Sequence, residues 1–448
     1  MLKHTDIFAA QLPRYTSYPT APHFTPDIQG AAYGEWLEQM EPGTPLSLYV
    51  HVPFCDTLCW FCACHTTVVN NYRPVSDYCD FLIRELELVS RHLSGRHPVT
   101  HIHWGGGSPT LLSDTDMRRL DAAVRSRFDV AANAEFAVEI DPRGFTQGMA
   151  ATLAACGVTR ASIGLQDCSP KVQRAINRVQ SDEEIQATTH WLRDNGINRL
   201  NLDLVYGLPH QTAEGIGRNL DLALGLHPDR IAIFGYAHVP HFKKHQALIS
   251  ETDLPDVAAR MALAQQAAAT LCEHGYRAVG IDHFALPHDA MAKALDNRSL
   301  RRNFQGYTTD TAPALLALGA SAIGFLPQGY LQNLTATPVW REAIGAGRLA
   351  AAKGRMLTSE DRLRRAVIEE IMCFLDADIG EICHRYNFPV SHLDGCMTRL
   401  QPLLAQDIVT LTGRKLTINP LYRQAARLAA AAFDAYLAPQ ESRHAVTA

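Results

Sequence analysis

The sequence contains no hydrophobic run long enough to cross a membrane. Its longest apolar stretch, residues 312–326, is too short to span a bilayer and is interrupted by Gly319, Ser321 and Gly324. The opening segment, MLKHTDIFAAQLPRYTSYPT, also lacks the continuous apolar core of a signal peptide. These absences exclude a membrane-spanning protein and predict a cytoplasmic one without a membrane partner.

An excess of positive charge is missing as well. The 448 residues include 41 Lys and Arg against 46 Asp and Glu, which gives a formal net charge of −5. This balance gives no general attraction to nucleic acid, so we expect no nucleic-acid partner. Hydrophobic residues make up 47% of the chain and charged residues 19%, values that are ordinary for a globular protein and exclude extensive disorder.

The cysteines do not form a disulfide framework, because their number, eleven, is odd and a cytoplasmic chain keeps its thiols reduced. Four of them, Cys55, Cys59, Cys62 and Cys64, lie within ten residues, and the others are scattered singly. A structural zinc site usually adds a second, distant pair of ligands, and no second CxxC follows. Three thiolates spaced C-x3-C-x2-C can instead hold three corners of a cubic [4Fe–4S] cluster and leave one iron open.

Strand-like and helix-like segments alternate over most of the chain. Helical patterns occur at 77–93 and 256–274, after a capping residue at Ser113, and from Ser169-Pro170. This alternation predicts βαβ units and a parallel sheet, either open or closed into a barrel. Strand patterns occur at 46–52, 101–104, 136–140, 160–165, 200–206, 230–236 and 277–282.

The pattern changes near residue 358. Helical segments at 361–374 and 379–386 precede a stretch at 408–418 with a turn at Gly413, and a final helix is expected from Leu421. Helices followed by a hairpin are typical of a winged-helix module. From Ser359 onward, however, 10 basic residues stand against 11 acidic ones, which does not suit a DNA-binding surface. We therefore expect a structural or substrate-covering module.

Three features in or next to predicted strands suggest ligand contacts. The triplet Gly105-Gly106-Gly107 follows a strand, and glycine lets the backbone approach a ligand closely because no Cβ intervenes. Glu139 ends another strand. Asp203 lies inside an apolar strand, where its carboxylate must be exposed at a site or paired, because an unpaired buried charge is costly.

The cysteine spacing resembles that of radical S-adenosylmethionine (SAM) enzymes, in which the open iron binds SAM and its reductive cleavage yields a 5′-deoxyadenosyl radical. From about residue 13 onward, the chain resembles the oxygen-independent coproporphyrinogen III oxidase family. The segments that carry the resemblance are PRYTSYPT (13–20), LSLYVHVPFC (46–55), HWGGGSPT (103–110), VEIDPR (138–143), NLDLVYGLP (201–209), YAHVP (236–240), IDHFALP (281–287) and RNFQGYTTD (302–310).

The resemblance implies an α/β fold: a radical SAM partial (β/α)6-type barrel with a smaller, mainly helical, winged-helix-like C-terminal domain. Residues 1–38 would form an N-terminal extension that packs on the active site. Residues 39–357 would form the catalytic domain, and residues 358–448 the C-terminal domain.

The resemblance also implies the site residues. The cluster ligands would be Cys55, Cys59 and Cys62, and two SAM molecules would bind side by side, with Gln166, Arg178 and Asp203 contacting the second. Cys64 is predicted to face the site and to contribute to turnover, although a packing role is the alternative. The residues that match SAM-lining positions are Tyr49, Phe61, Gly106, Gly107, Ser108, Glu139, Gln166, Arg178, Asp203, Ala237 and Ile323.

Three positions depart from the family pattern. Ser108 replaces a common threonine and keeps the hydroxyl. Cys168 stands where an aromatic residue is expected, so the packing beside the second SAM site can differ. Gly235 stands where many relatives carry a polar side chain. None of the three is a predicted cluster ligand, so the implied activity is unchanged.

The implied activity is oxidative decarboxylation of two propionates of coproporphyrinogen III to vinyl groups, giving protoporphyrinogen IX in haem synthesis. A monomer supplied by a low-potential electron donor such as flavodoxin or ferredoxin is expected. A haem chaperone-like paralogue and a haem-degrading radical methyltransferase relative are the alternatives. Chaperone paralogues typically lack both the cysteine at Cys64 and the PRYTSYPT opening, and this chain has both.

Overall fold

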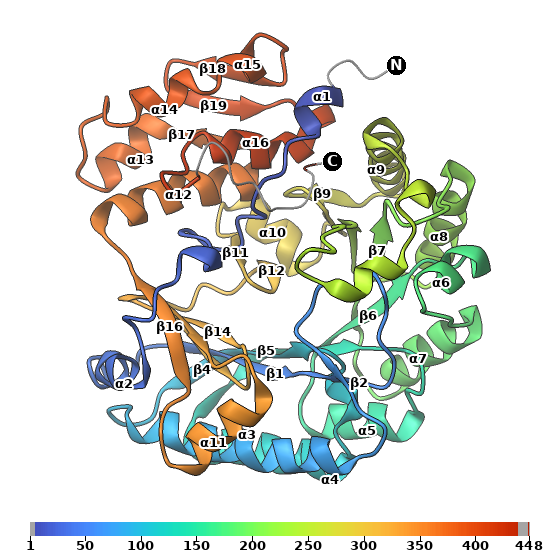
Figure 1. The fold of residues 1–448 in the computed structure, drawn as a ribbon, viewed down its shortest axis with the longest axis vertical. Helices are drawn as coiled ribbons and strands as arrows, with labels where there is room; N and C mark the ends of the chain where they lie inside the picture. Colours follow the sequence, from blue (N-terminus) through green and yellow to red (C-terminus); the bar gives the residue numbers. More distant parts are fainter. Residues whose placement is uncertain (1–4, 438–446, 448) are drawn as a thin grey trace.

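The computed structural model describes residues 5–437 and 447, and a twelve-stranded sheet runs through its centre (Figure 1). The strand order is β16-β15-β14-β13-β1-β4-β5-β6-β7-β8-β10-β9. No pairing joins β16 to β9 among the described strands, so the sheet is open between these edges. The predicted fold class is confirmed.

Six consecutive parallel strands form the middle of the sheet, and each is followed by at least one helix. The six strands are β1 (Leu46–Val52), β4 (Pro98–Gly106), β5 (Asp129–Ile140), β6 (Arg160–Gln166), β7 (Arg199–Tyr206) and β8 (Arg230–Gly235). Strands β1, β6, β7 and β8 are mostly buried, as expected for parallel strands covered by helices, whereas β4 and β5 alternate buried with partly exposed residues. A further strand, β13 (Ala314–Leu318), pairs with β1 in parallel. The helices are α3 (Arg73–Arg91), α4 (Asp114–Arg127), α5 (Gln147–Ala155), α6 (Pro170–Ala175), α7 (Asp182–Asp194), α8 (Ala213–Gly225) and α9 (Val257–Glu273).

Local sequence signals explain several of these boundaries. The predicted cap at Ser113 is confirmed, because its side chain accepts a hydrogen bond of 3.2 Å from the Asp116 backbone N–H at the start of α4. Ser181 and Glu184 form a capping box at the start of α7. Helix α3 buries one apolar face against the sheet, including Tyr78, Leu82 and Leu86. Together these contacts fix the loops that connect the strands to the helices.

The sheet continues beyond β1 and β8 with shorter strands. The predicted strand at 277–282 is wrong in extent, because the chain turns at Gly280 between the antiparallel strands β9 (Arg277–Val279) and β10 (His283–Ala285). Gly280 has φ 55°, and a Cβ there would meet the Tyr307 ring at about 2.0 Å. The remaining elements are β13 (Ala314–Leu318), β14 (Ile323–Leu326), β15 (Gly329–Asn333), β16 (Ala351–Met356), the hairpin β11 (Arg301–Asn303) and β12 (Gly306–Thr308), α10 (Ala290–Asp296) and α11 (Thr337–Gly345).

The C-terminal segment is mainly helical with a small antiparallel sheet, as predicted. The turn at Gly413 is confirmed, whereas the last helix begins at Ala426 rather than Leu421, because Tyr422 has non-helical dihedrals (φ −119°, ψ 38°) inside a preceding 3₁₀ turn. The elements are α12 (Ser359–Phe374), β17 (Asp376–Asp378), α13 (Ile379–Arg385), α14 (Asp394–Thr398), α15 (Gln401–Leu404), β18 (Val409–Thr412), β19 (Lys415–Ile418) and α16 (Ala426–Ala431).

The N-terminal segment contacts both parts of the molecule. Helix α1 (Thr5–Phe8) and the buried residues Tyr15 and Tyr18 join the apolar cluster of the C-terminal segment, and Tyr15 Oη donates to Asp434 Oδ2 at 3.1 Å. Helix α2 (Gly30–Glu38) packs on the main core instead. The domain boundaries stay a prediction. None of the helices described is long and apolar enough for a membrane span.

Candidate active site

The cysteine loop leaves the carboxyl end of β1 and includes the short strands β2 (Phe54–Cys55) and β3 (Thr67–Val68). Side chains from other loops bind its backbone: Asn177 Nδ2 donates to Leu58 O at 2.9 Å, and Gln246 Nε2 donates to Phe61 O at 3.0 Å. The loop is therefore held by hydrogen bonds from two further βα units of the sheet.

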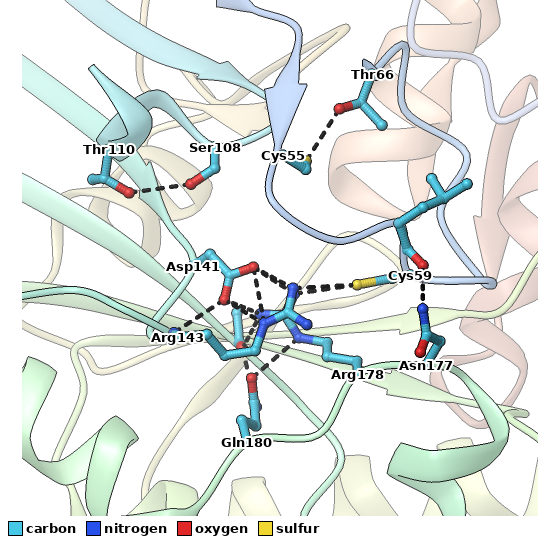
Figure 2. A network of polar contacts seen from close by, with 12 residues as sticks. Cys55, Cys59, Thr66, Ser108, Thr110, Asp141, Arg143, Asn177, Arg178 and Gln180 are labelled. Atoms are coloured by element: carbon cyan, nitrogen blue, oxygen red, sulfur yellow. Dashed lines mark hydrogen bonds and ion pairs between the residues drawn. The ribbon is translucent and has the colours of Figure 1, made fainter. Parts of the chain in front are cut away.

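Each of the three predicted ligand sulfurs accepts a hydrogen bond. Thr66 Oγ1 donates to Cys55 Sγ at 3.1 Å, and the backbone N–H of Cys64 donates to Cys62 Sγ at 3.3 Å. Cys59 Sγ accepts from two guanidinium groups, as shown in Figure 2. Donors aimed at sulfur stabilise a thiolate, which is the form that binds iron.

The three thiols suit an iron–sulfur cluster. Among residues 5–437, no three His, Cys, Asp or Glu side chains gather closely enough to share one ion. A cubic cluster uses one thiolate per iron, so its ligands stand farther apart, and a loop with three sulfurs facing one cavity fits it.

A cavity of about 440 Å³ opens at the carboxyl ends of the parallel strands, where enzymes with this arrangement place their sites. Apart from Ser108 and Ile323, the predicted site residues line it, and they come from segments between β1 and the loop after β8. The residues are Tyr49, Cys55, Cys59, Phe61, Cys62, Cys64, Gly106, Gly107, Glu139, Gln166, Arg178, Asp203 and Ala237.

The glycine triplet fits closely between protein groups. A Cβ on Gly107 would lie 2.4 Å from the carbonyl oxygen of Phe54, so only glycine lets the end of β4 lie against the cysteine loop. Backbone hydrogen bonds stabilise this contact, because the Gly107 N–H donates to Val52 O at 2.9 Å. The predicted role of the triplet, close approach to a ligand, is therefore joined by a second one, which is positioning the cysteine loop.

Glu139 is held in its charged form at the end of β5. It accepts from the Gly106 backbone N–H at 2.9 Å and contacts His103 Nε2 at 3.1 Å. Burial opposes ionisation, but the hydrogen bond and charge of His103, with the Gly106 N–H, lower the pKa of Glu139 below its usual value. The site thus presents a carboxylate near the glycine triplet.

Asp203 differs from Glu139 in the direction of its pKa shift. Burial raises its pKa, and the nearby Glu139 charge adds to that shift, although Ser162 Oγ at 2.6 Å and Asn201 Nδ2 at 2.8 Å donate to it. As predicted for a carboxylate in an apolar strand, it lines the cavity with polar partners. Two carboxyl groups in one cavity with opposite pKa shifts can serve different tasks.

Arg178 belongs to a network that ends on Cys59, a predicted cluster ligand (Figure 2). Its Nη1 lies 3.6 Å from Cys59 Sγ and 3.1 Å from Asp141 Oδ2, and its Nη2 donates to Gly164 O at 2.8 Å. Arg143 Nη2 donates to the same carboxylate at 2.6 Å and to Cys59 Sγ at 3.5 Å. Despite burial, the charges of Arg178 and Arg143 lower the pKa of Asp141.

Sequence reasoning missed Asp141 and Arg143 as site residues. Both lie in the quoted segment VEIDPR, where Asp141 and Arg143 follow Glu139 at spacings of two and four residues. That charge pattern at the end of a strand was the available signal. The reasoning also missed the buried floor of the cavity, where Arg160 Nη2 and Arg230 Nε donate to Asp289 at 3.0 and 2.7 Å.

Two predicted residues lie away from the main cavity. The Ser108 hydroxyl pairs with Thr110 Oγ1 at 3.1 Å, as Figure 2 shows, and it is buried. Ile323 lines a neighbouring cavity. Of the departures from the family pattern, Cys168 packs against the main core, and a Cβ on Gly235 would lie 2.9 Å from Tyr206 Oη.

Comparisons with known proteins agree with this geometry. The Radical SAM superfamily pattern matches residues 49–223. The oxygen-independent coproporphyrinogen III oxidase of Bradyrhizobium diazoefficiens is 48% identical over 434 residues, covering 97% of this chain and 96% of its own. The chain belongs to the oxygen-independent coproporphyrinogen III oxidase family.

Other members of this family extend the match to the whole fold. The anaerobic coproporphyrinogen III oxidase 1 of Cereibacter sphaeroides is 43% identical and covers 98% of this chain and 97% of its own. The solved structure of the Escherichia coli coproporphyrinogen III oxidase, described as a radical SAM enzyme, superimposes with a TM-score of 0.90 at 35% identity. It covers 96% of this chain and 100% of that one, so the C-terminal segment is part of the family fold.

Proposed function

We propose that this chain is a radical SAM oxidoreductase that converts two propionates of coproporphyrinogen III to vinyl groups, giving protoporphyrinogen IX in haem synthesis. The observation that carries the proposal is the set of three hydrogen-bonded thiols facing a cavity that also contains Glu139 and Gly106. Whole-length similarity to named members of the family supports the substrate.

Bound together, a [4Fe–4S] cluster and SAM supply a 5′-deoxyadenosyl radical able to abstract a hydrogen atom from the β-carbon of a propionate. Cys55, Cys59 and Cys62 would hold the cluster. Arg143 and Arg178 direct positive charge at Cys59 Sγ, which compensates the negative charge of a thiolate-bound cluster.

The remaining cavity residues bind and orient. The Glu139 carboxylate offers a hydrogen-bond acceptor to the amino group of a methionyl moiety, and the glycine at 106 lets that group approach the backbone closely. The buried ring of Tyr49 lines the same space. The buried core behind β1 and β4 excludes bulk water from that wall. Fixed orientation is the protein's main contribution to a radical reaction, because the reactive carbon must lie in contact with the abstracting group.

Two SAM molecules per chain remain part of the proposal. Gln166 from β6, Asp203 from β7 and Arg178 from the loop between α6 and α7 line the cavity. None of these residues belongs to the segment that contains the glycine triplet. Asp203→Asn should lower the binding stoichiometry from about two to nearer one and leave iron content unchanged. Asp194→Asn, an exposed acid at the end of α7, is the matched control. One molecule per parent chain would contradict the proposal.

An anaerobic assay tests the activity. Reconstituted protein with SAM, a low-potential reductant and coproporphyrinogen III should yield the monovinyl intermediate and then protoporphyrinogen IX, separated by chromatography after oxidation. Haem binding without vinyl formation would instead identify a haem chaperone, and a methylated tetrapyrrole would identify a methyltransferase. A flavodoxin- or ferredoxin-type donor, a monomeric state and a cytoplasmic location are further parts of the proposal.

A further inference from the structure

A second cavity of about 300 Å³, here called the side chamber, lies next to the main cavity. The two share wall residues Asn303, Thr308, Asp310 and Leu315, so they are separated only by the β11–β12 hairpin and adjoining chain. Figure 1 shows this hairpin between the central sheet and the C-terminal helices. The side chamber therefore adjoins the main cavity across these shared residues.

The side chamber carries an excess of positive charge. Four arginines line it, against two acidic side chains. Both acids already have partners, because Asp310 lies 3.2 Å from His101 Nδ1 and Glu369 lies 3.6 Å from an exposed arginine of the hairpin. The arginines are Arg301, Arg302, Arg362 and Arg365.

Two of these arginines keep donors available. Nε and Nη1 of Arg302 are buried without a hydrogen-bond partner in the described chain, and its guanidinium lies 4.4 Å from the Tyr307 ring. The Arg365 guanidinium lies 4.2 Å from the Phe325 ring and makes no hydrogen bond or ion pair with any residue described. Stacking on a ring leaves the planar N–H edge of arginine free to bind a carboxylate.

The rest of the wall combines apolar and polar side chains. The apolar ones include Phe304, Leu315, Ile323, Phe325 and Tyr330, and the polar ones include Thr16, Asn303, Thr308 and Thr311. Apolar surface with a few convergent cationic donors suits a ligand that combines a hydrocarbon body with anionic groups at its edge. A propionate-bearing tetrapyrrole has this chemistry.

We propose that the side chamber binds the propionates that are not reacting, with Arg302 and Arg365 pairing to their carboxylates. The inference rests on the proposed function, because it names the substrate contacts of that site. The macrocycle would extend from the cysteine loop, where one propionate reacts, past the β11–β12 hairpin. Since the main cavity must also hold SAM, the substrate needs this additional space.

The test measures substrate recognition separately from activity. Reconstituted holoenzymes of the parent, Arg302→Gln, Arg365→Gln and the control Arg298→Gln are titrated with coproporphyrin III and, separately, with its tetra-amide. Arg298 also lies over an aromatic ring and contacts Glu370 and Asp376, yet lines neither cavity. KM for coproporphyrinogen III, SAM affinity and iron content are measured on the same samples.

Each Gln variant of Arg302 and Arg365 should raise the Kd for coproporphyrin III and the KM roughly 10-fold to 100-fold, the scale of one charged hydrogen bond. The SAM affinity and iron content of these variants should equal those of the parent, and the Arg298→Gln control should match the parent in every measurement. The parent should bind the tetra-amide at least about 10-fold more weakly than the acid, and this ligand-side comparison decides the case if a variant does not fold.

Three results would overturn the inference. The first is a change below about twofold in the Kd for coproporphyrin III and in the KM in both variants. The second is equal binding of the acid and the amide by the parent. The third is loss of SAM binding in the variants while their porphyrin binding stays intact. An active parent with such variants would leave the proposed function standing. A parent that forms no vinyl product would instead remove the function on which the inference depends.

Discussion

At the residue scale, three thiols and their donors determine whether a cluster forms. Each predicted ligand sulfur accepts a hydrogen bond, and the backbone N–H of Cys64 donates to Cys62 Sγ at 3.3 Å. The Cys64 carbonyl oxygen accepts from Lys243 Nζ at 2.9 Å, so the residue is fixed by its backbone. Ligand and neighbour are thus distinguishable by mutation.

Changing any of Cys55, Cys59 or Cys62 to Ala should abolish cluster loading, because two thiolates do not hold the cube. Cys64→Ala should keep the cluster, measured as iron content and by absorption under anaerobic conditions, and should lower turnover. Cys64→Ser with parental activity would instead assign Cys64 a packing role. Loss of the cluster in Cys64→Ala with retention in Cys59→Ala would contradict the ligand assignment.

Glu85, a buried residue of α3 whose hydrogen-bond donors are all neutral, makes the stability of the chain depend on pH. It accepts from Gly319 N–H at 2.6 Å, Asn333 Nδ2 at 2.8 Å and Trp340 Nε1 at 3.1 Å, and it makes no ion pair with any described residue. Burial raises the pKa of Glu85 to about 7, and these hydrogen bonds only partly offset the shift. The folded chain therefore retains a proton that the unfolded chain releases.

This shift makes stability depend on pH. Between about pH 4.5 and 7 the folded state binds more protons at Glu85 than the unfolded state, so the free energy of unfolding should fall as pH rises, by about 3 kcal/mol from this group. Denaturant titrations across that range should show a flatter profile in Glu85→Gln. Parallel profiles for parent and variant would mean that Glu85 is ionised in the folded chain.

At the element scale, the end of β4 positions the cysteine loop. The Gly107 Cα lies so close to the loop backbone that a Cβ would meet Phe54 O at 2.4 Å and Phe54 N at 2.8 Å. Backbone atoms cannot move aside as a flexible side chain can. The loop and the strand end therefore form one unit.

Gly107→Ala should displace the cysteine loop, destabilise the chain by about 1–3 kcal/mol and reduce cluster content after reconstitution. Gly148→Ala is the matched control, because the nearest atom to its Cβ, Thr146 Oγ1, is 3.8 Å away within α5. Thermal unfolding and iron analysis measure the two effects. Full cluster loading in Gly107→Ala would show that the loop can shift without consequence.

The strand–helix alternation was predictable because each element carries its own periodicity and cap. The strand at 46–52 and the cap at Ser113 depend on neighbouring residues alone. The turn at Gly280 depends on Tyr307, which is far away in sequence, so no local pattern revealed it. Arg178 was predicted only as a contact to the second SAM molecule, and the charged group that it forms with Asp141 and Arg143 around Cys59 arises only when β5 and the cysteine loop meet.

At the scale of the whole molecule, the N-terminal and C-terminal segments share one apolar cluster. Phe8, Tyr15 and Tyr18 pack with Phe433 and its neighbours, and the Thr447 backbone N–H donates to Ala10 O at 2.9 Å. Between these anchors, Arg14 lines the main cavity and donates to Gly235 O at 3.0 Å. Part of the cavity wall therefore depends on the C-terminal segment.

Phe433→Ala should cost about 3–5 kcal/mol of unfolding free energy, because the ring is fully buried. Since the cluster includes Phe8, Tyr15 and Tyr18, limited proteolysis should then cut within residues 5–20 faster than in the parent. Leu421→Ala, at a side chain that is 68% exposed, is the control. An N-terminal segment that stays protected in Phe433→Ala would mean that it is anchored independently.

The contact between Ala10 and Thr447 has a consequence for biosynthesis. Residues near 10 and residues near 430 pack in the same cluster, so the N-terminal segment cannot reach its folded position until residues near 430 have been synthesised. The wall that includes Arg14 is therefore completed long after the cysteine loop has been made. Until then, the cysteine loop belongs to a cavity that still lacks this wall.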